Sequence, residues 1–268
     1  MSAVHPTWQK TKPDDADDNH WGWTFGSKDD AFSNQTGHGA IKVDDIEPEP
    51  LYGLKNVRQL YEMCGSPEKK YVVPTLWDTK EKTIVSNESS EIIEMFNSRF
   101  NELAENPGLD LAPEHLQAAM DEVNPWIYKG INNGVYSCGF AKTQEAYDEA
   151  VGNLFNSLDK LEAHLEGKKY LTGDTLTLSD IRLFVTLVRF DEVYVVYFKT
   201  DVKKISEYPN IFKYCCEMWK VPGIKETTNM EHIKKHYYTS HAHLNPFAIV
   251  PRGPDFMGQM DRAIAKGQ

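Results

Sequence analysis

From about residue 112 onward, the hydrophobic pattern of this sequence follows a helical period almost without a break. In the clearest stretch, apolar residues recur from Val151 through Leu154, Leu158 and Leu165, and Glu and Lys occupy the opposite positions. Gly167 then supplies the residue type that commonly ends a helix. The second half of the chain is therefore predicted to fold as a group of amphipathic helices.

A second helix start is visible at Thr177-Leu178-Ser179-Asp180. Thr177 can cap the helix, and the Asp180 side chain can reach back to the backbone of Thr177. The residues that follow are apolar enough to predict a central helix. Further helices are predicted at 115–133, 208–219 and 229–238, and turns containing Pro and Gly separate them.

The first 50 residues have a different character, because Gly, Pro and Asp are dense there and apolar residues are few. This composition predicts a long loop, and loops of this length are usually functional or disordered. The loop contains Trp21-Gly22-Trp23-Thr24-Phe25. Three aromatic residues in a polar stretch need a surface to pack on, so they either anchor the loop to the core or contact a ligand.

Residues 57–100 combine helix and strand signals. A helix is predicted from Val57 to Cys64, and the runs 71–73 and 83–85 are predicted to pair as a hairpin. Pro74 follows the first run and raises the chance of a cis peptide bond. A helix is predicted to begin near Ser89, where its free N–H groups would favour an anion. Two strands form only a marginal sheet, so the front end either borrows strands from residues 2–8 or is incomplete.

The charge balance excludes some classes of partner. The 268 residues carry 40 Asp and Glu against 29 Lys and Arg, a net charge of −11. An acidic chain is a poor match for nucleic acid or an anionic membrane surface, because both need a cationic face. Four cysteines that form no Cys-x-x-Cys pattern are too few for a disulfide framework. We therefore expect a cytoplasmic protein.

Two groups of residues were weighed as metal ligands or nucleophiles. His232 and His236 lie four residues apart and could share a helix face, but Lys234 and Lys235 between them oppose a dication. We therefore expect no metal. Cys138 lies among small residues without a nearby cation to lower the pKa of its thiol, so packing is favoured over reactivity. The tyrosines are either core residues or the lining of an aromatic pocket; they are Tyr136, Tyr194, Tyr197, Tyr237 and Tyr238.

Taken together, several motifs resemble one family, the glutathionyl-hydroquinone reductases, which are the Xi class of glutathione transferases. The similarity covers nearly the whole chain in the right order. Its motifs are Val73-Pro74-Thr75-Leu76-Trp77-Asp78, Ile84-Val85-Ser86-Asn87-Glu88-Ser89-Ser90-Glu91, Asn132-Asn133-Gly134-Val135-Tyr136, Leu178-Ser179-Asp180-Ile181-Arg182, Val188-Arg189-Phe190-Asp191, His232-Ile233-Lys234-Lys235-His236-Tyr237-Tyr238 and Asn245-Pro246.

The resemblance implies an α+β fold, with a thioredoxin-like domain that binds glutathione followed by an all-α glutathione transferase C-terminal domain. On this basis we expect a thioredoxin-like domain over 1–108, a helical domain over 109–240 and an extended tail over 241–268. The implied reaction is the glutathione-dependent removal of glutathione from glutathionyl-hydroquinones, which releases the hydroquinone and glutathione disulfide. The family also implies a homodimer.

The resemblance further implies five glutathione-binding residues. Val73, before the expected cis Pro74, would pair with the backbone of the glutathione cysteine. Glu88 and Ser89 would hold the γ-glutamyl end, and Trp23, with Arg58 less firmly, would border the tripeptide.

Two tyrosines would serve the second substrate. The resemblance implies that Tyr136 and Tyr237 face the hydroquinone and hydrogen-bond to its oxygen as charge shifts on departure of the sulfur.

One departure from the family pattern is large. Family members begin with a strand and a helix that carry a Cys-Pro-Trp-Ala stretch, whose cysteine is the nucleophile, and no Cys-Pro occurs in these 268 residues. The sequence opens at Met1 on what resembles the end of the family's second strand. We therefore expect an incomplete thioredoxin-like domain that lacks its first strand-helix unit. The alternative is a truncated, non-catalytic protein of this fold with a binding or dimerisation role.

Overall fold

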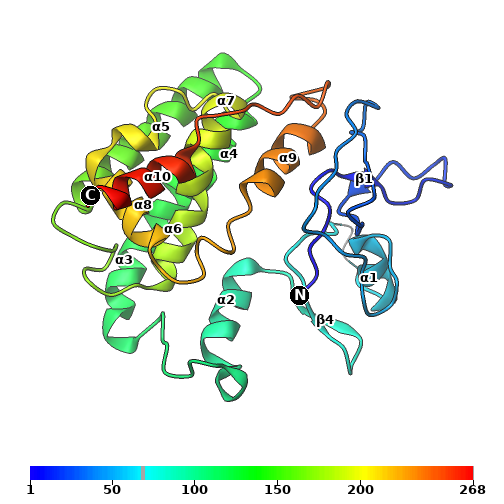
Figure 1. Ribbon diagram of the computed structural model, residues 1–268, viewed down its shortest axis with the longest axis horizontal. Coiled ribbons are helices and arrows are strands. Elements are labelled where there is room, and N and C mark those ends of the chain that lie inside the picture. Colours follow the sequence, from blue (N-terminus) through cyan, green and yellow to red (C-terminus); the bar gives the residue numbers. More distant parts are fainter. Residues whose placement is uncertain (68–69, 268) are drawn as a thin grey trace. The chain divides into compact units, whose positions relative to one another are not determined.

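The computed structural model describes residues 1–67 and 70–267 of the chain, and helices dominate it (Figure 1). Two compact units are present, each assembled from two stretches of chain. Unit 1 comprises residues 1–96 and 230–251, and unit 2 comprises residues 97–229 and 252–268. No described helix is both long enough and apolar enough to cross a membrane.

Unit 1 contains four short strands and three helices. In chain order they are β1 (Gln9–Lys10), β2 (Trp21–Gly22), α1 (Val57–Met63), β3 (Leu76–Asp78), β4 (Thr83–Ser86), α2 (Ser89–Ser98), whose last two residues pass into unit 2, and α9 (Met230–Ser240). The strands form two separate antiparallel pairs, β1 with β2 and β3 with β4. Residues 2–8 are not a strand, so of the two alternatives that the sequence left open, the borrowing of strands from these residues does not occur.

The predicted hairpin exists, but one of its two strands was predicted at the wrong residues. Residues 71–73 are not a strand, and the strand that pairs with Thr83–Ser86 is Leu76–Asp78, beyond Pro74. The backbone of the predicted run has other partners: the carbonyl of Val72 accepts hydrogen bonds from the hydroxyls of Tyr61 at 3.0 Å and Thr75 at 3.0 Å. Proline also has no N–H to donate to a strand ladder.

The named elements in the described part of unit 2 are all helices, joined by loops. In chain order it contains η1 (Asn101–Leu103), η2 (Glu114–Leu116), α3 (Gln117–Ile127), η3 (Tyr128–Asn132), α4 (Asn133–Gly139), α5 (Gln144–His164), α6 (Leu178–Arg189), η4 (Phe190–Tyr194), α7 (Val195–Tyr197), η5 (Ile205–Glu207), α8 (Pro209–Trp219) and α10 (Phe256–Ala265). The predicted apolar stripe of α5 is buried, with Leu154, Leu158 and Leu161 all fully inaccessible. Helix α6 contacts α3 and α8, as expected of a central helix.

The start of α6 confirms the predicted capping residues. The Asp180 carboxylate accepts hydrogen bonds from the backbone N–H of Thr177 at 2.8 Å and of Leu171 at 2.9 Å. It also accepts from the Thr177 hydroxyl at 2.9 Å and the Tyr214 hydroxyl at 3.2 Å. Asp180 is fully buried, so this one side chain holds the preceding loop, the helix start and α8 together.

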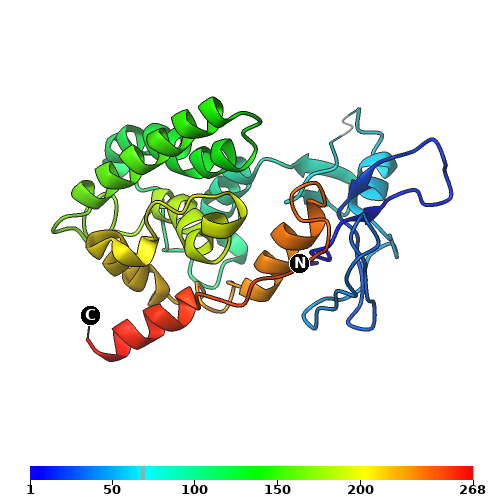
Figure 2. The ribbon, with the colours of Figure 1, turned by 90° about the horizontal axis from the view of Figure 1, so that it is seen from above.

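The C-terminal part differs from the expected extended tail, because residues 256–265 form α10. The Asp255 side chain accepts from the Gly258 N–H at 3.1 Å, and the buried Glu192 carboxylate accepts from the Phe256 N–H at 2.6 Å. Figure 2 shows α10 in red, and it packs on α8 within unit 2. The compact units also divide the chain differently from the expected limits at 108 and 240, since α9 groups with the N-terminal residues.

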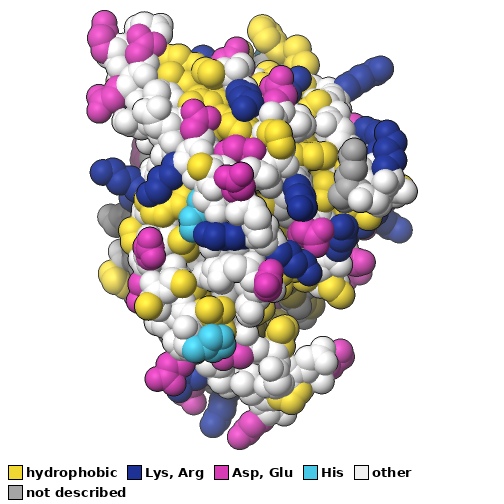
Figure 3. Space-filling view, turned by 90° about the vertical axis from the view of Figure 1, so that its left-hand side faces the viewer, with side chains coloured by type: hydrophobic (Ala, Val, Ile, Leu, Met, Phe, Trp, Pro, Cys, Tyr) yellow, Lys and Arg dark blue, Asp and Glu magenta, His cyan; other side chains and the backbone are white. Residues whose placement is uncertain are grey.

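Charged groups on the surface are mixed in sign. On the face drawn in Figure 3, acidic and basic side chains are interspersed with apolar ones, and the basic groups there do not join into one cationic patch.

The Asp180 cluster yields a stability prediction. Asp180→Ala leaves the buried N–H groups of Leu171 and Thr177 without an acceptor, and we expect the free energy of unfolding to fall by about 3 kcal/mol. Urea titration followed by circular dichroism measures this change. Asp174→Ala, on the exposed part of the same loop, is the control and should change stability by less than about 0.5 kcal/mol. Equal effects of the two substitutions would contradict the assigned role.

Candidate functional site

The segment around Val73 has the predicted backbone form. The Val73–Pro74 peptide bond is cis. The carbonyl next to it, that of Val72, is fixed by the hydroxyl of Tyr61, a residue of α1 that is only 1% exposed. Tyr61 therefore anchors this turn to the interior of unit 1.

The same tyrosine reaches the start of α2. The Asn87 side-chain amide donates to the Tyr61 hydroxyl at 3.0 Å, so Tyr61 connects the Val73 turn to the Asn87-Glu88-Ser89 segment. The Ser86 hydroxyl accepts from the Glu88 N–H at 3.1 Å and donates to the Glu91 carboxylate at 2.8 Å. These bonds fix the backbone, and the side chains of Glu88 and Ser89 stay exposed. Two of the predicted elements are thus brought together by a residue that sequence reasoning had counted only as part of a helical pattern.

Trp23 lies in a cluster of aromatic and histidine rings. The ring of His236 stacks on Trp23, with centroids 4.4 Å apart and planes at 27°. Trp8 meets the Trp23 ring edge-on at 5.7 Å. The aromatic loop segment is therefore anchored by packing, and this packing also defines the orientation of Trp23.

Arg58 is occupied by interactions within unit 1. Its guanidinium pairs with Asp18 at 2.6 Å and with Glu62 at 2.9 Å, and it lies over the ring of Tyr71 at 5.2 Å. Burial opposes the charge, but the hydrogen bonds to Asp18 and Glu62 raise the pKa of Arg58 above its ordinary value. The side chain is 11% exposed, which leaves little of it to contact a ligand.

Tyr136 and Tyr237 belong to different units, Tyr136 to unit 2 and Tyr237 to unit 1. Tyr136 is 38% exposed and packs near Phe198 at 5.3 Å and Phe140 at 6.2 Å. Gly139 permits this packing, because a Cβ there would lie 2.0 Å from the Phe198 ring. Tyr237, on α9, is 6% exposed and lies 5.3 Å from the ring of His236.

The cysteines do not form a reactive site. Cys138 is 1% exposed, and burial raises the pKa of its thiol to about 11. Burial also raises the pKa values of Cys215 and Cys216. Since the thiolate is the nucleophilic form, these three are packed as neutral thiols. The Cys64 thiol is half-buried and donates to the Tyr61 carbonyl at 3.4 Å.

The structure gives His236 a packing role. No group of three or more His, Cys, Asp or Glu within the part of the chain that the structure describes is arranged to hold a metal ion. His236 places Nδ1 3.0 Å from the Pro6 carbonyl, and its ring contacts Trp8 at 5.7 Å and His241 at 5.5 Å. His232 and His236 were predicted to share one helix face. Of these two residues, His236 packs against neighbouring rings.

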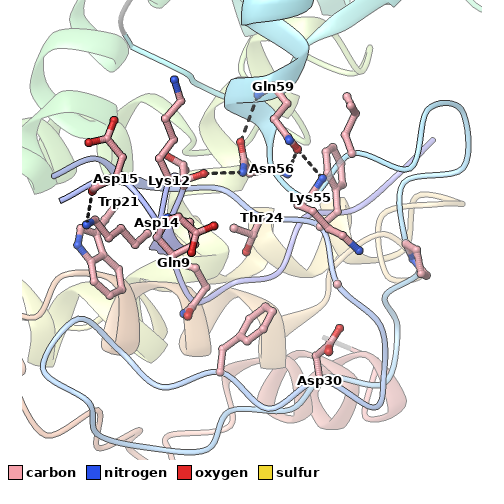
Figure 4. A pocket seen from close by; sticks show the side chains of 18 of the residues that line it. Gln9, Lys12, Asp14, Asp15, Trp21, Thr24, Asp30, Lys55, Asn56 and Gln59 are labelled. Carbon is pink, nitrogen blue, oxygen red and sulfur yellow. Dashed lines mark hydrogen bonds between the residues drawn. The ribbon is translucent and has the colours of Figure 1, made fainter. Parts of the chain in front are cut away.

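A cavity of about 1190 Å³ opens elsewhere on unit 1, and sequence reasoning missed it (Figure 4). It is lined by the Pro- and Asp-rich loop and by the start of α1, and none of the seven predicted site residues lines it. The buried hydroxyl of Thr24 on its wall has no hydrogen-bond partner among the described residues. Lysine and aspartate side chains both surround the opening, so its charge does not favour one class of ligand.

Known proteins resemble this chain in sequence. The family model described as "Glutathione S-transferase, C-terminal domain" matches residues 144–215. Glutathionyl-hydroquinone reductase YqjG of Escherichia coli is 48% identical over 235 residues, which cover 87% of this chain and 67% of that protein.

Solved structures agree. The glutathione-bound structure of YqjG, a glutathione transferase homolog from Escherichia coli K-12, superposes with a TM-score of 0.80 at 44% identity, covering 94% of this chain and 74% of the other. The glutathione-S-transferase Xi from Phanerochaete chrysosporium gives 0.81 at 44% identity, covering 95% and 80%. The expected α+β architecture with a glutathione transferase helical domain is confirmed.

The histidines of unit 1 generate a pH prediction. Burial lowers the pKa of His5 from its ordinary value of 6.5 to about 4. Between these values the unfolded chain binds a proton that the folded chain does not, so stability should rise with pH across this window. We expect His5→Asn to reduce the slope by up to about 1.4 kcal/mol per pH unit, measured by urea unfolding from pH 4 to pH 7. His38→Asn, at an exposed histidine, is the control, and an unchanged slope in His5→Asn would refute the prediction.

Proposed function

This chain belongs to the glutathionyl-hydroquinone reductases, the Xi class of glutathione transferases, and we propose that it functions in the glutathione-dependent reduction of S-glutathionyl-hydroquinones to hydroquinones. The observation that carries the proposal is the pairing, through Tyr61, of the cis Val73–Pro74 turn with the Glu88-Ser89 helix start. This pairing holds a stretch of backbone close to a helix N-terminus, and a tripeptide would bind to both. The other family motifs occur in the same order along the chain.

Each part of this site has a role in holding glutathione. The backbone at Val73 would pair with the cysteine of glutathione. Ser89 and the first N–H groups of α2 would bind the γ-glutamyl carboxylate, because a helix N-terminus favours an anion. Glu88 would pair with the γ-glutamyl ammonium, and Trp23 would cover the tripeptide, with Arg58 acting through Asp18 and Tyr71 rather than by direct contact.

The reaction needs a thiolate. A cysteine thiolate attacks the sulfur of the glutathionyl group, the bond from that sulfur to the ring carbon breaks, and the ring takes up a proton to give the hydroquinone. Free glutathione then attacks the mixed disulfide and releases glutathione disulfide and the cysteine thiolate. Tyr136 and Tyr237 would hydrogen-bond to the ring oxygens while charge moves onto the ring.

The nucleophile is proposed to come from outside these 268 residues. The sequence contains no Cys-Pro, and Cys138, Cys215 and Cys216 are buried with raised pKa values. We propose that the protein acts as a cytoplasmic homodimer.

A second candidate function follows from the same three thiols. If no such cysteine joins the site, the chain would bind glutathione or dimerise without catalysis. The two functions differ in turnover and share the glutathione site.

Glutathione binding is the first test. We expect isothermal titration to detect binding, and we expect Glu88→Gln combined with Ser89→Ala to weaken it at least about tenfold, since charge-assisted hydrogen bonds each contribute about 1.5–3 kcal/mol. Glu81→Gln, on the exposed turn of the hairpin that precedes α2, is the matched control. No binding by the unaltered chain, or equal affinity of all variants, would refute the proposed site.

Turnover tests the cysteine assignment. With glutathione and glutathionyl-menadione, the unaltered chain and Cys138→Ser should give the same rate, no faster than that of glutathione alone, because the thiol is buried and neutral. Loss of a measurable rate on this substitution would show that Cys138 is the nucleophile and overturn the assignment.

A further inference from the structure

One histidine ring lies between residues with two different expected roles. The ring of His236 stacks on Trp23 at 4.4 Å and lies 5.3 Å from the ring of Tyr237. Trp23 is expected to border glutathione, and Tyr237 is expected to face the hydroquinone. All three residues belong to unit 1.

The position of His236 is itself fixed. Its Nδ1 lies 3.0 Å from the Pro6 carbonyl oxygen, and because a carbonyl only accepts, Nδ1 carries the proton. The Ser240 hydroxyl donates to the same oxygen at 2.6 Å, and the backbone N–H of Trp8 donates to the Ser240 hydroxyl at 3.1 Å. These bonds hold α9 against residues 6–8, so the imidazole has a fixed orientation relative to that segment.

Trp23 is in turn held from two directions. His236 covers a face of the indole, with ring planes at 27°, and Trp8 meets the indole edge-on, with planes at 84°. A stacked ring and an edge-on ring each stabilise an aromatic side chain by about 0.5–1.5 kcal/mol beyond the area they bury. Of these two ring contacts, removal of the imidazole would leave Trp23 with the edge contact to Trp8.

From these contacts we propose that His236 is a positioning residue of the glutathione site: its ring orients Trp23 against the tripeptide and ties that orientation to Tyr237. This role rests on the proposed function. It acts through Trp23 and requires no contact between His236 and the substrate.

The competing interpretation is that His236 only packs α9. The two interpretations differ in what an aromatic replacement does. His236→Phe keeps a flat ring against Trp23 and loses the hydrogen bond to Pro6, whereas His236→Asn keeps a polar group and loses the stack. A positioning role predicts that Phe rescues the site and Asn does not; a role confined to the Pro6 hydrogen bond predicts the reverse.

The first measurement needs no ligand. The indole N–H resonance of Trp23, assigned by its loss in Trp23→Phe, is compared between the unaltered chain and the variants in the free protein. We expect a clear shift in His236→Asn and His236→Ala, a smaller one in His236→Phe, and none in His243→Ala, which removes an exposed histidine near the same cluster. An unshifted Trp23 resonance in His236→Ala would overturn the proposal.

The second measurement is glutathione affinity alongside the unfolding temperature. We expect His236→Ala and His236→Asn to weaken binding about three- to tenfold, and His236→Phe and His243→Ala to stay within about twofold of the unaltered chain. If the glutathione affinity of the variants instead falls in step with their unfolding temperature, and His236→Phe does not restore it, then His236 is a packing residue. That result would refute the positioning role. Absence of glutathione binding by the unaltered chain would refute the proposed function instead, and the Trp23 resonance would still decide whether His236 orients that ring.

Discussion

The docking of α9 onto residues 6–8 is the contact on which the arrangement of unit 1 depends. A single carbonyl, that of Pro6, accepts from Ser240 and faces Nδ1 of His236, and the hydroxyls of Thr7 and Thr239 bond to each other at 2.7 Å. More than 220 residues of chain separate the two sides. Without this contact the aromatic loop would lose His236, the stacking partner of Trp23.

Buried carboxylates have the corresponding role in unit 2. Asp180 binds the start of α6, Asp191 accepts from the N–H groups of Ile205 at 2.7 Å and Ser206 at 3.1 Å, and Glu192 accepts from Phe256. Burial raises the pKa values of Asp180 and Asp191, so their charged forms are costly in the fold, and the backbone donors offset this cost. Each carboxylate supplies an acceptor to N–H groups that the helices and turns leave unpaired.

The sequence was most informative where the signal is local. The α5 stripe, the Thr177–Asp180 pair and the cis bond before Pro74 each depend on residues close in the chain, and the structure contains all three. The same reasoning failed at Tyr71–Val73, where β-prone residues lose their strand partners to the Tyr61 and Thr75 hydroxyls, and at residues 256–265, where a distant glutamate caps a helix. For the site, the residue types came from resemblance. Their supports, Tyr61 and His236, act over long sequence separations that no periodicity encodes.

The two units are interleaved along the chain, and this has a consequence for how the protein is made. During synthesis the N-terminal stretch of unit 1 emerges first, but its partner α9 follows only after nearly all of unit 2. Unit 2 likewise waits for α10, which follows α9 in the chain. Neither unit can complete its contacts until these later helices have been translated, so its long-range contacts form late. Until then Trp8 and Trp23 lack the rings of α9 and remain available to other hydrophobic surfaces, so residues 1–96 need protection from misassociation while residues 97–229 are translated.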